Sequence, residues 1–503
     1  MKLVYYKYAF GIIHLYKIIL ILLLKKYTVH LEEVILQLNK LHTISSKLDL
    51  QQSERLAMFK IVADYSNKFI NELPNVKGFS TKEPQLLAID NTPKELKNIL
   101  HLYQTEVAET GINAASGTHM GYIPGGGVYT AALADFLAAI TNPFASVYYA
   151  SPGAATIENE VINWLKKVFS FPENTVGNLT SGGSVSTLIA FTAARDKHQI
   201  KNDLIKKSVV YLSEQVHHST QKALRIVGLE DIIIRYVPLN EYHRMKADAL
   251  EQIMKEDVAK GLNPFLIVAT AGTTDTGAID PLQEIAVIAK KYTAWFHIDA
   301  AYGGFFILTS KKEMFNGIEE ADSIIIDPHK SMFLPYGLGA VLIKDKAAAL
   351  YSNQYTANYM QDAVMDELVQ NPSNVSPELT KHFRGLRMWL PLQFHGVEPF
   401  VACLEEKLLL VKYFRLKLQA LGFCIGPEPD LSISYFWYPF TVDANEKNKQ
   451  LMQAIHDDGS VFLSSSVINK QFVIRIAILA FRTKKETVDK ALAMIERCLQ
   501  KVQ

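Results

Sequence analysis

The segment ADSIIIDPHKSMF, residues 321–333, places a lysine directly behind a short apolar run. The run at 322–326 has strand character, and its lack of polar alternation is typical of a strand that is buried on both faces. Lys330 therefore stands where such a strand should end. Because ligands of open α/β sheets bind beyond the carboxyl ends of the strands, this end is a candidate functional site.

Helical and strand-like segments alternate on both sides of this run. The alternation predicts an α/β domain with a mostly parallel sheet. We expect strands at 208–212, 231–237, 265–270, 294–299, 322–326 and 339–343, with helices near 184–197, 218–227, 247–258 and 281–291. An amphipathic helix is predicted earlier, at 53–73. Beyond residues 383–397, a long helix, two strands and a final helix predict a smaller α+β domain.

The composition excludes several classes of function. The chain has 503 residues, of which 49% are hydrophobic and 20% are charged, so it can bury a large core. Lys plus Arg (52) nearly balance Asp plus Glu (51), which argues against nucleic acid as a partner. The three cysteines, Cys403, Cys424 and Cys498, are widely spaced and form no metal-ligand pattern. We therefore expect no metal site and a reducing, cytoplasmic location.

The N-terminus is the one anomaly in composition. Residues 8–24 are strongly apolar and flanked by lysines, but His14 and Lys17 interrupt them. The clean run at 18–24 is too short to span a bilayer, and KKYTVHLEE supplies no signal-peptide cleavage site. We expect a helix packed on the protein or a translation start placed too early. A weak membrane-surface anchor is the third alternative.

Four predicted strand ends carry polar groups that can form one site. They are GNLTSGGSVSTL (177–188), YLSEQVHHS (211–219), WFHIDAAYGG (295–304) and IIIDPHK (324–330). In the first, Gly182 and Gly183 open a predicted helix with Ser184 in its first turn, and the free N–H groups and dipole of this helix suit a phosphate. A plain helix start is the alternative for this segment.

Asp299 and His217 stand at two of the other strand ends. A carboxylate that ends an apolar strand is costly unless it meets a cation or a donor, although an isolated aspartate here is often a turn former. His217 could lie flat over a ring, and otherwise it is a structural or solvent-facing residue. The neighbouring His218 has no assigned role.

Lys330 connects these groups chemically. A lysine amine becomes useful when it forms a Schiff base. The cofactor that does so, while also needing a phosphate cradle and an acidic partner for its pyridine nitrogen, is pyridoxal 5′-phosphate (PLP). The combination of lysine, carboxylate, histidine and cradle therefore predicts a PLP site.

The motifs TSGGS, HIDAAYGG, DPHK and KHFRGLRMW closely resemble those of the group II PLP-dependent amino acid decarboxylases. This family includes the aromatic L-amino acid, glutamate, histidine and cysteine sulfinate decarboxylases. The resemblance implies a fold-type I enzyme shaped like aspartate aminotransferase, with a seven-stranded-type sheet, acting as a homodimer with active sites at the interface. It divides the chain into an N-terminal extension (1–50), a helical dimerisation segment (51–128), a large PLP-binding domain (129–388) and a small C-terminal domain (389–503).

The resemblance also implies roles for individual residues. Lys330 is the lysine of the internal aldimine, and Asp299 pairs with the pyridinium nitrogen. Ala301 packs under the cofactor ring and His217 stacks above it. The remaining cofactor contacts implied by the motifs are Gly183, Ser184, Thr274, Asp327 and His329.

Asp327 is a departure from the commonest motif, because many relatives carry Asn at this position. A carboxylate near a phosphate is unfavourable unless a donor or a proton intervenes. Archaeal tyrosine and aspartate decarboxylases of the family are also similar to DPHK, so the change is compatible with activity.

The implied reaction is decarboxylation, in which the protonated pyridine takes up electrons and Asp299 keeps its nitrogen protonated. The segment YTANYMQD, 355–362, resembles the mobile loop of the family, and Tyr359 matches the tyrosine that protonates the quinonoid. Tyr355 remains the alternative donor. Relatives that produce aldehydes often carry Phe there, so the tyrosine favours simple decarboxylation.

The substrate class rests on a further resemblance. Residues 117–135 are similar to the stretch that lines the substrate pocket, with Tyr122, Ile123 and Pro124 near the ligand and Phe144 reaching in from the partner subunit. An apolar lining suits an aromatic side chain, so we expect a tyrosine, dopa or tryptophan decarboxylase. ATAGTTDTGAIDP is instead similar to the glutamate and cysteine sulfinate enzymes, which keeps acidic substrates, aspartate included, as the alternative. Arg475 is shared by both branches.

Two further interpretations remain open. A membrane-associated PLP lyase of the sphingosine-phosphate lyase type has a similar fold and would give the apolar N-terminus a purpose. A non-catalytic PLP-binding scaffold is disfavoured, because it has no need to keep Lys330, Asp299, His217 and Tyr359 together.

Overall fold

The structure is a computed structural model that describes residues 2–85, 87–89, 91–354 and 370–503. The chain forms two compact units. The N-terminal unit comprises Met1–Glu72 and Ile89–Leu102, and the main unit comprises Leu73–Ala88 and Tyr103–Gln503. Each unit is described by itself, and Tyr355 and Tyr359 lie outside the described residues.

The N-terminal unit is helical. Its main helices are α1 (Lys2–Ser45) and α2 (Gln52–Glu72), and α3 (Leu96–Tyr103) begins within it. The expected helix at 53–73 is thus confirmed. α1 runs unbroken through His14 and Lys17, and the side chains of residues 5–49 are all exposed. Within its own unit the helix therefore leaves these side chains uncovered, and packing of α1 on the rest of the protein stays a prediction. By length and composition alone, this helix could cross a membrane.

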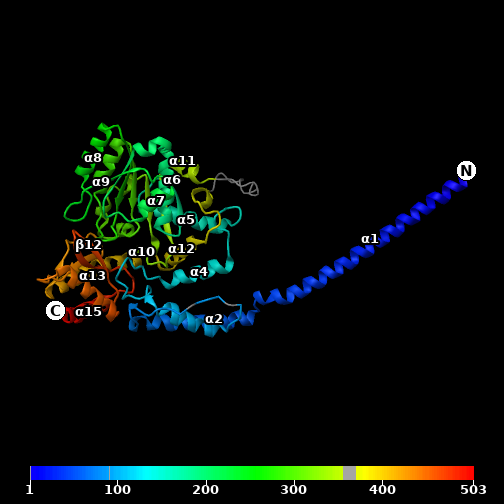
Figure 1. The fold of residues 1–503 in the computed structure, drawn as a ribbon, viewed down its shortest axis with the longest axis horizontal. Coiled ribbons are helices and arrows are strands. Elements are labelled where there is room, and N and C mark those ends of the chain that lie inside the picture. Colours follow the sequence, from blue (N-terminus) through cyan, green and yellow to red (C-terminus); the bar gives the residue numbers. More distant parts are fainter. Residues whose placement is uncertain (1, 86, 90, 355–369) are drawn as a thin grey trace. The chain divides into compact units, whose positions relative to one another are not determined.

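A seven-stranded sheet forms the centre of the main unit (Figure 1). Its strands are β3 (Val176–Thr180), β4 (Ser208–Leu212), β5 (Ile233–Tyr236), β6 (Asn263–Thr270), β7 (Trp295–Asp299), β8 (Ser323–Ile326) and β9 (Gly339–Ile343). The spatial order is β3-β9-β8-β7-β6-β4-β5, and only β9 runs antiparallel to its neighbours. The predicted mostly parallel α/β sheet is confirmed.

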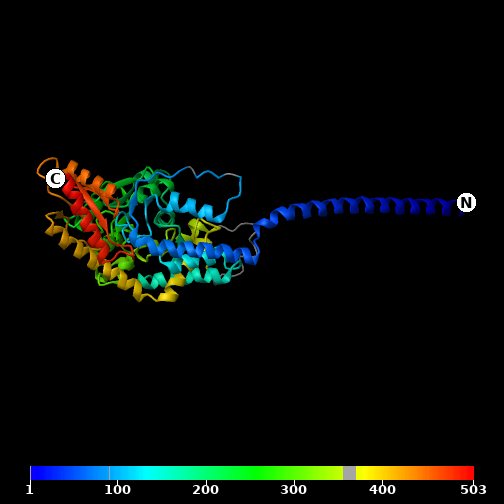
Figure 2. The same ribbon diagram turned by 90° about the horizontal axis from the view of Figure 1, so that it is seen from below.

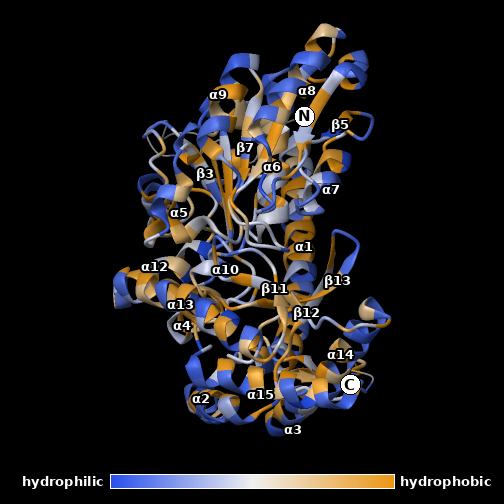
Figure 3. Ribbon diagram, turned by 90° about the vertical axis from the view of Figure 1, so that its left-hand side faces the viewer, coloured by the Kyte–Doolittle hydropathy of each residue, from blue (hydrophilic) through white to orange (hydrophobic). Residues whose placement is uncertain are grey.

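Alternating side chains of each strand enter two separate cores, which explains the unbroken apolar runs in the sequence. Ile324 and Ile326 belong to one core and Ile325 to the other. The first core is covered by α5 (Pro152–Val168), α8 (Ala247–Ala259) and α9 (Leu282–Tyr292), and the second by α6 (Gly183–Lys197), α7 (Ser219–Ile226) and α11 (Lys346–Asn353). The strands are largely hydrophobic in Figure 3, whereas the covering helices carry hydrophilic residues as well.

The C-terminal part of the main unit contains a second, antiparallel sheet. Its order is β10-β11-β13-β12, from β10 (Cys424–Ile425), β11 (Ile433–Trp437), β12 (Ser464–Ile468) and β13 (Gln471–Ala477). Helices α13 (Glu398–Ala420), α14 (Ala444–Asp458) and α15 (Lys485–Val502) pack on it around a third core. This confirms the smaller α+β region. The remaining elements include β1 (Phe79–Ser80), β2 (Gly111–Ile112), α4 (Tyr129–Thr141), α10 (Pro328–Ser331) and α12 (Arg384–His395).

A buried ion pair joins α5 to β3 and α12. The Lys381 Nζ lies 2.8 Å from the Glu158 Oε2, and both side chains are almost fully buried. Lys381 also donates to the Leu179 carbonyl at 3.2 Å, and the Glu158 Oε1 accepts from the Gly385 N–H at 2.6 Å. The pair therefore fixes the end of β3, which leads directly into the predicted phosphate cradle.

We expect Lys381→Met to lower the free energy of unfolding by about 3–5 kcal/mol, because it leaves the Glu158 carboxylate buried without a cation. Urea denaturation followed by circular dichroism measures the change. Lys485→Met is the matched control, since Lys485 pairs with Asp489 at 2.7 Å on the surface and its loss should leave the midpoint unchanged. Equal effects of the two substitutions would contradict the structural role of the buried pair.

Candidate active site

The turn between β3 and α6 forms an open cradle of backbone N–H groups. The Thr180 Oγ1 accepts from the Gly182 N–H at 3.2 Å and lies 2.7 Å from the Ser186 Oγ, which holds the turn against the first turn of α6. α6 begins at Gly183, and the N–H groups of Val185 and Ser186 donate to the Gly182 carbonyl, whereas those of Gly183 and Ser184 have no partner within the helix. An anion fits at this helix end, as expected from TSGGS.

The cradle lies directly against the segment that carries Lys330. A Cβ atom on Gly339 would lie only 2.6 Å from the Gly182 Cα and 2.7 Å from the Asp327 Oδ1, so this approach requires glycine. A Cβ atom on Gly183 would lie 3.1 Å from the Asp327 Oδ2. The carboxylate of Asp327 is therefore a close neighbour of the anion cradle.

Lys330 lies in α10, the short helix that follows β8. Its Nζ is 2.9 Å from the Asp327 Oδ2, and the Nε2 of His329 is 3.7 Å from the same oxygen. Burial acts to lower the pKa of Lys330, but the carboxylates of Asp327 and Asp299 outweigh it, and the pKa is raised. In the ligand-free pocket the amine is thus an ammonium held between two carboxylates.

Asp299 ends β7, the strand beside β8, and its side chain is buried. Its Oδ1 accepts from the Ala301 N–H at 3.0 Å. Burial raises the pKa of Asp299, while the Lys330 ammonium and this hydrogen bond act in the opposite direction. The group can therefore serve as a buried carboxylate partner for a cationic ring nitrogen.

His217 lies just before α7 and is held as a neutral ring. Its Nδ1 accepts from the Ser219 N–H at 3.2 Å and lies 2.7 Å from the Ser219 Oγ. Burial, with help from His218 and Lys330, lowers the pKa of His217 to about 4. Near neutral pH the imidazole is uncharged and can face an aromatic ring without adding a cation to the pocket.

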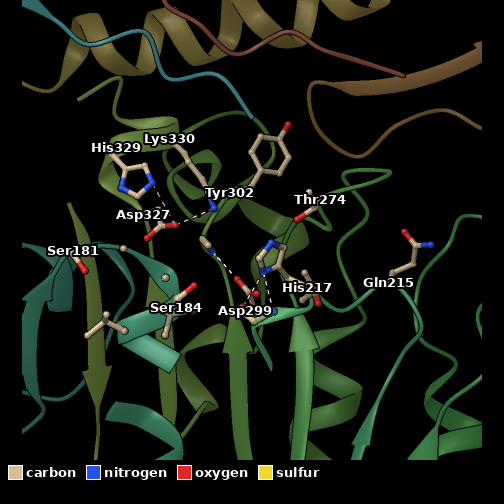
Figure 4. A pocket seen from close by; sticks show the side chains of 18 residues that line it. Ser181, Ser184, Gln215, His217, Thr274, Asp299, Tyr302, Asp327, His329 and Lys330 are labelled. Atoms are coloured by element: carbon tan, nitrogen blue, oxygen red, sulfur yellow. Dashed lines mark hydrogen bonds and ion pairs between the residues drawn. The ribbon is translucent and has the colours of Figure 1, made fainter. Parts of the chain in front are cut away.

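The nine residues expected to contact the cofactor all line one pocket of about 290 Å³ beyond the strand ends of the large sheet (Figure 4). This volume is at the lower end of the usual range for small-molecule sites. The nine are Gly183, Ser184, His217, Thr274, Asp299, Ala301, Asp327, His329 and Lys330. Sequence reasoning did not assign Gln215, Thr270 and Tyr302, which also line the pocket. Gln215 and Tyr302 lie inside the strand-end motifs YLSEQVHHS and WFHIDAAYGG, so their position in these motifs could have identified them as pocket residues.

Tyr336 is a further residue that sequence reasoning missed. It follows Lys330 by six residues, its ring centroid lies 5.8 Å from that of His329, and it interacts electrostatically with Lys330. Burial raises the pKa of Tyr336, and the Lys330 ammonium partly opposes this. The motif DPHK contains no signal for it, because the contact depends on how the chain turns after α10.

The residues expected to surround the substrate are not among those that line this pocket. Ile123 and Pro124 are buried, Tyr122 is exposed with its ring against Phe462, and Phe144 is half-buried. The segment nevertheless approaches the Lys330 turn, because a Cβ atom on the next residue, Gly125, would lie 2.2 Å from the His329 carbonyl oxygen.

Arg475 ties the segment at Tyr122 to the Thr274 loop. Its guanidinium donates to the carbonyls of Tyr122 (2.9 Å), Asp275 (3.0 Å) and Thr274, and to the Ser464 Oγ (3.1 Å). Tyr122 adopts a left-handed backbone conformation (φ +51°), which this clamp on its carbonyl helps to hold. In this arrangement Arg475 is a buried structural clamp.

The donor set fits PLP. A lysine amine suits the aldehyde, a buried carboxylate suits the pyridine nitrogen, and the first turn of α6 suits the phosphate. The Asp327 Oδ1 is buried and has no hydrogen-bond partner in the described chain, which marks the space beside the cradle as one where a donor is missing. Among the described residues, no group of three or more His, Cys, Asp and Glu is placed to hold a metal ion.

Comparison with known proteins leads to the same chemistry. The family described as "Pyridoxal-dependent decarboxylase conserved domain" matches residues 81–438. The chain is 32% identical to the aromatic-L-amino-acid decarboxylase of Bacillus atrophaeus over 423 residues, which covers 82% of this chain and 88% of that protein.

Two solved structures have a similar fold. Tryptophan decarboxylase of Catharanthus roseus, solved in complex with L-tryptophan, superposes with a TM-score of 0.83 at 23% identity, covering 90% of this chain and 99% of that one. A glutamate decarboxylase domain of the diaminobutyrate-pyruvate transaminase and L-2,4-diaminobutyrate decarboxylase from Vibrio parahaemolyticus superposes with a TM-score of 0.77 at 25% identity, covering 88% and 96%. Together with the pocket, these matches show that the chain belongs to the pyridoxal-dependent decarboxylases, the group II enzymes that use PLP to remove carbon dioxide from an amino acid.

Proposed function

We propose that this enzyme decarboxylates an aromatic L-amino acid, of the tyrosine, dopa or tryptophan class, to its amine. The main support for an aromatic substrate is the similarity to the Bacillus aromatic-L-amino-acid decarboxylase, which extends over most of both chains. The apolar residues Ile123 and Pro124 directly precede Gly125, whose backbone lies against the Lys330 turn, and this sequence position is in keeping with an apolar substrate.

Lys330 and Asp299 are the central catalytic residues in this proposal. Lys330 would hold the cofactor through its amine, the group that a substrate amine would replace. When bound, the cofactor supplies an electron sink for the bond that breaks. Asp299, buried and hydrogen-bonded to the Ala301 N–H, keeps a proton on the ring nitrogen by remaining a carboxylate beside it.

The surrounding residues hold the ring and the phosphate. The neutral His217 and Ala301, which both line the pocket, would hold the cofactor ring. Gly183 and Ser184 bind the phosphate through the first turn of α6. Thr274 and His329 complete the cofactor contacts.

Tyr359 is the proposed donor of the proton that replaces the lost carboxylate, with Tyr355 as the alternative; both are outside the described residues. A pocket phenol that the structure describes is less suitable. The Tyr302 hydroxyl pairs with the Ser432 Oγ at 2.7 Å, and burial raises the pKa of Tyr302 to about 12. The Tyr302 oxygen also accepts from the Ser432 N–H at 3.1 Å, so this hydroxyl is engaged with Ser432.

We further propose a cytoplasmic homodimer with active sites at the subunit interface. Cys403, Cys424 and Cys498 are free thiols, which is in keeping with a reducing compartment. In this proposal Phe144 of one subunit approaches the substrate bound in the other.

An acidic or diamino acid substrate is the second candidate. It is favoured by the likeness to the Vibrio glutamate decarboxylase domain, whose identity to this chain is 25%. In the described part of the chain, however, the residues that line the pocket include no arginine, and Arg475 is engaged with backbone carbonyls. A side-chain carboxylate would need another cation.

Asp299→Asn should reduce kcat at least ~100-fold, equivalent to about 2.7 kcal/mol of activation free energy, because the ring nitrogen loses its carboxylate partner. Stopped-flow measurement of CO₂ release gives the rate, and circular dichroism verifies the fold. Asp322→Asn is the matched control: Asp322 accepts from the Phe296 N–H at the opposite end of the same strands. A slow control and an active Asp299→Asn variant would refute the assignment.

Asp327→Asn should bind PLP more tightly, by roughly tenfold, since a fixed negative charge is removed from beside the phosphate. The substitution also removes a carboxylate that raises the pKa of Lys330, so more of the amine is uncharged and able to react. Fluorescence titration of the apoenzyme with PLP measures the dissociation constant. Weaker binding by the variant would mean that Asp327 itself helps to hold the cofactor.

The substrate class is tested by CO₂ release from a panel of L-tyrosine, L-dopa, L-tryptophan, L-phenylalanine, L-histidine, L-glutamate, L-aspartate, cysteine sulfinate and L-2,4-diaminobutyrate. We expect release from aromatic members only, with a raised KM after Ile123→Asp. Release confined to acidic or diamino members would replace the proposal by the second candidate. Absence of release from any member, with cofactor bound, would point to a lyase of a different substrate.

A further inference from the structure

Helix α1 has a large exposed apolar surface over the described residues 5–27. It is a single helix of 44 residues, about 66 Å long, drawn unbroken in Figure 2. Phe10 is 77% exposed, Tyr16 72% and Leu22 59%, and every other large apolar side chain from Tyr5 to Tyr27 is also exposed. Isolated exposed apolar residues are ordinary, but a continuous apolar surface of this length indicates a binding surface.

The charge on this segment has one sign. Lys7, Lys17, Lys25 and Lys26 lie among the apolar residues, and no Asp or Glu occurs before Glu32. A basic, apolar segment without acidic residues is complementary to an anionic lipid surface, whose headgroups attract lysines while the acyl region receives the apolar side chains.

The positions of the charges around the helix show how it would lie. At 100° per residue, Lys7, His14 and Lys25 fall within about 20° of one another, and Lys17 lies about 80° to one side. The opposite side carries Ile12, Tyr16, Ile19, Leu20 and Leu23. Lys26 lies about 100° to the other side of Lys7, so the lysines of residues 5–27 occupy one half of the helix circumference and no charged residue lies on the other half.

We propose that residues 5–27 bind in the plane of an anionic lipid bilayer, with the apolar side in the acyl region and the lysines at the headgroups. A spanning orientation would place Lys17 near the bilayer centre, whereas an in-plane helix keeps it in water. A second copy of the helix is a poorer partner, because it brings the same lysines and no acidic residue to pair with them. The inference is independent of which amino acid the enzyme decarboxylates.

Vesicle flotation of the full-length enzyme tests the proposal. The probes are vesicles of phosphatidylcholine alone and of phosphatidylcholine with phosphatidylglycerol. We expect the enzyme to float with the anionic vesicles, with less binding to the neutral vesicles and at high salt. Lys25→Glu with Lys26→Glu should lower partitioning roughly tenfold or more.

A second pair of variants separates the apolar side from general helix disruption. Ile19→Glu with Leu23→Glu should abolish flotation, because both charges lie on the side that enters the acyl region. Leu36→Glu with Leu41→Glu is the matched control: these residues lie on the same helix outside the segment and are 71% and 62% exposed. The control pair should float as the wild type does, and all variants should retain decarboxylase activity.

Three outcomes would overturn the proposal. The first is wild-type enzyme that stays in the bottom fraction with both vesicle types. The second is a change of oligomeric state in the Ile19→Glu, Leu23→Glu variant without any vesicle binding by the wild type, which would assign the surface to a second copy. The third is membrane binding that resists alkaline carbonate extraction and is unchanged by Lys25→Glu with Lys26→Glu. That result would indicate that the segment spans the membrane.

Discussion

The buried ammonium of Lys330 is the charge around which the pocket is arranged. A cation at the end of a fully buried strand is tolerated only with counter-charges, and Asp327 and Asp299 supply them from the ends of β8 and β7. These strands are parallel neighbours, so their carboxyl ends meet at the same edge of the sheet. The strand order therefore brings Lys330, Asp327 and Asp299 together. The cofactor chemistry depends on this order and on these charges.

A steric constraint joins the anion cradle to this cluster. The backbone of Gly182 passes so close to Gly339 that a side chain at the start of β9 would separate them. With glycine there, the first turn of α6 and the Asp327 carboxylate come into contact. The pocket consequently holds an anion site and the Asp327 side chain side by side, so this side chain should influence how firmly a phosphate is held.

Much of the fold and the cofactor site could be predicted from local sequence. The strands at 208–212 and 339–343 were located correctly because each is an unbroken apolar run, and Lys330 and Asp299 were found because each directly follows or ends such a run. The interaction of Tyr336 with Lys330 could not be predicted, because it depends on the path of the chain after α10. The surface that covers α1 could not be predicted either, because an apolar run indicates a helix but does not identify its partner.

The antiparallel β9 also has a consequence for the order in which the site forms. β8 pairs with β9 within one short stretch of chain, Ser323 with Ile343, so the turn that carries Lys330 closes over a small loop. β3 pairs with the same strand across roughly 160 residues, Thr180 with Gly339. During folding we therefore expect β8, the Lys330 turn and β9 to assemble before the anion cradle packs beside them. A nascent chain would then expose the Lys330 amine before it can bind a phosphate.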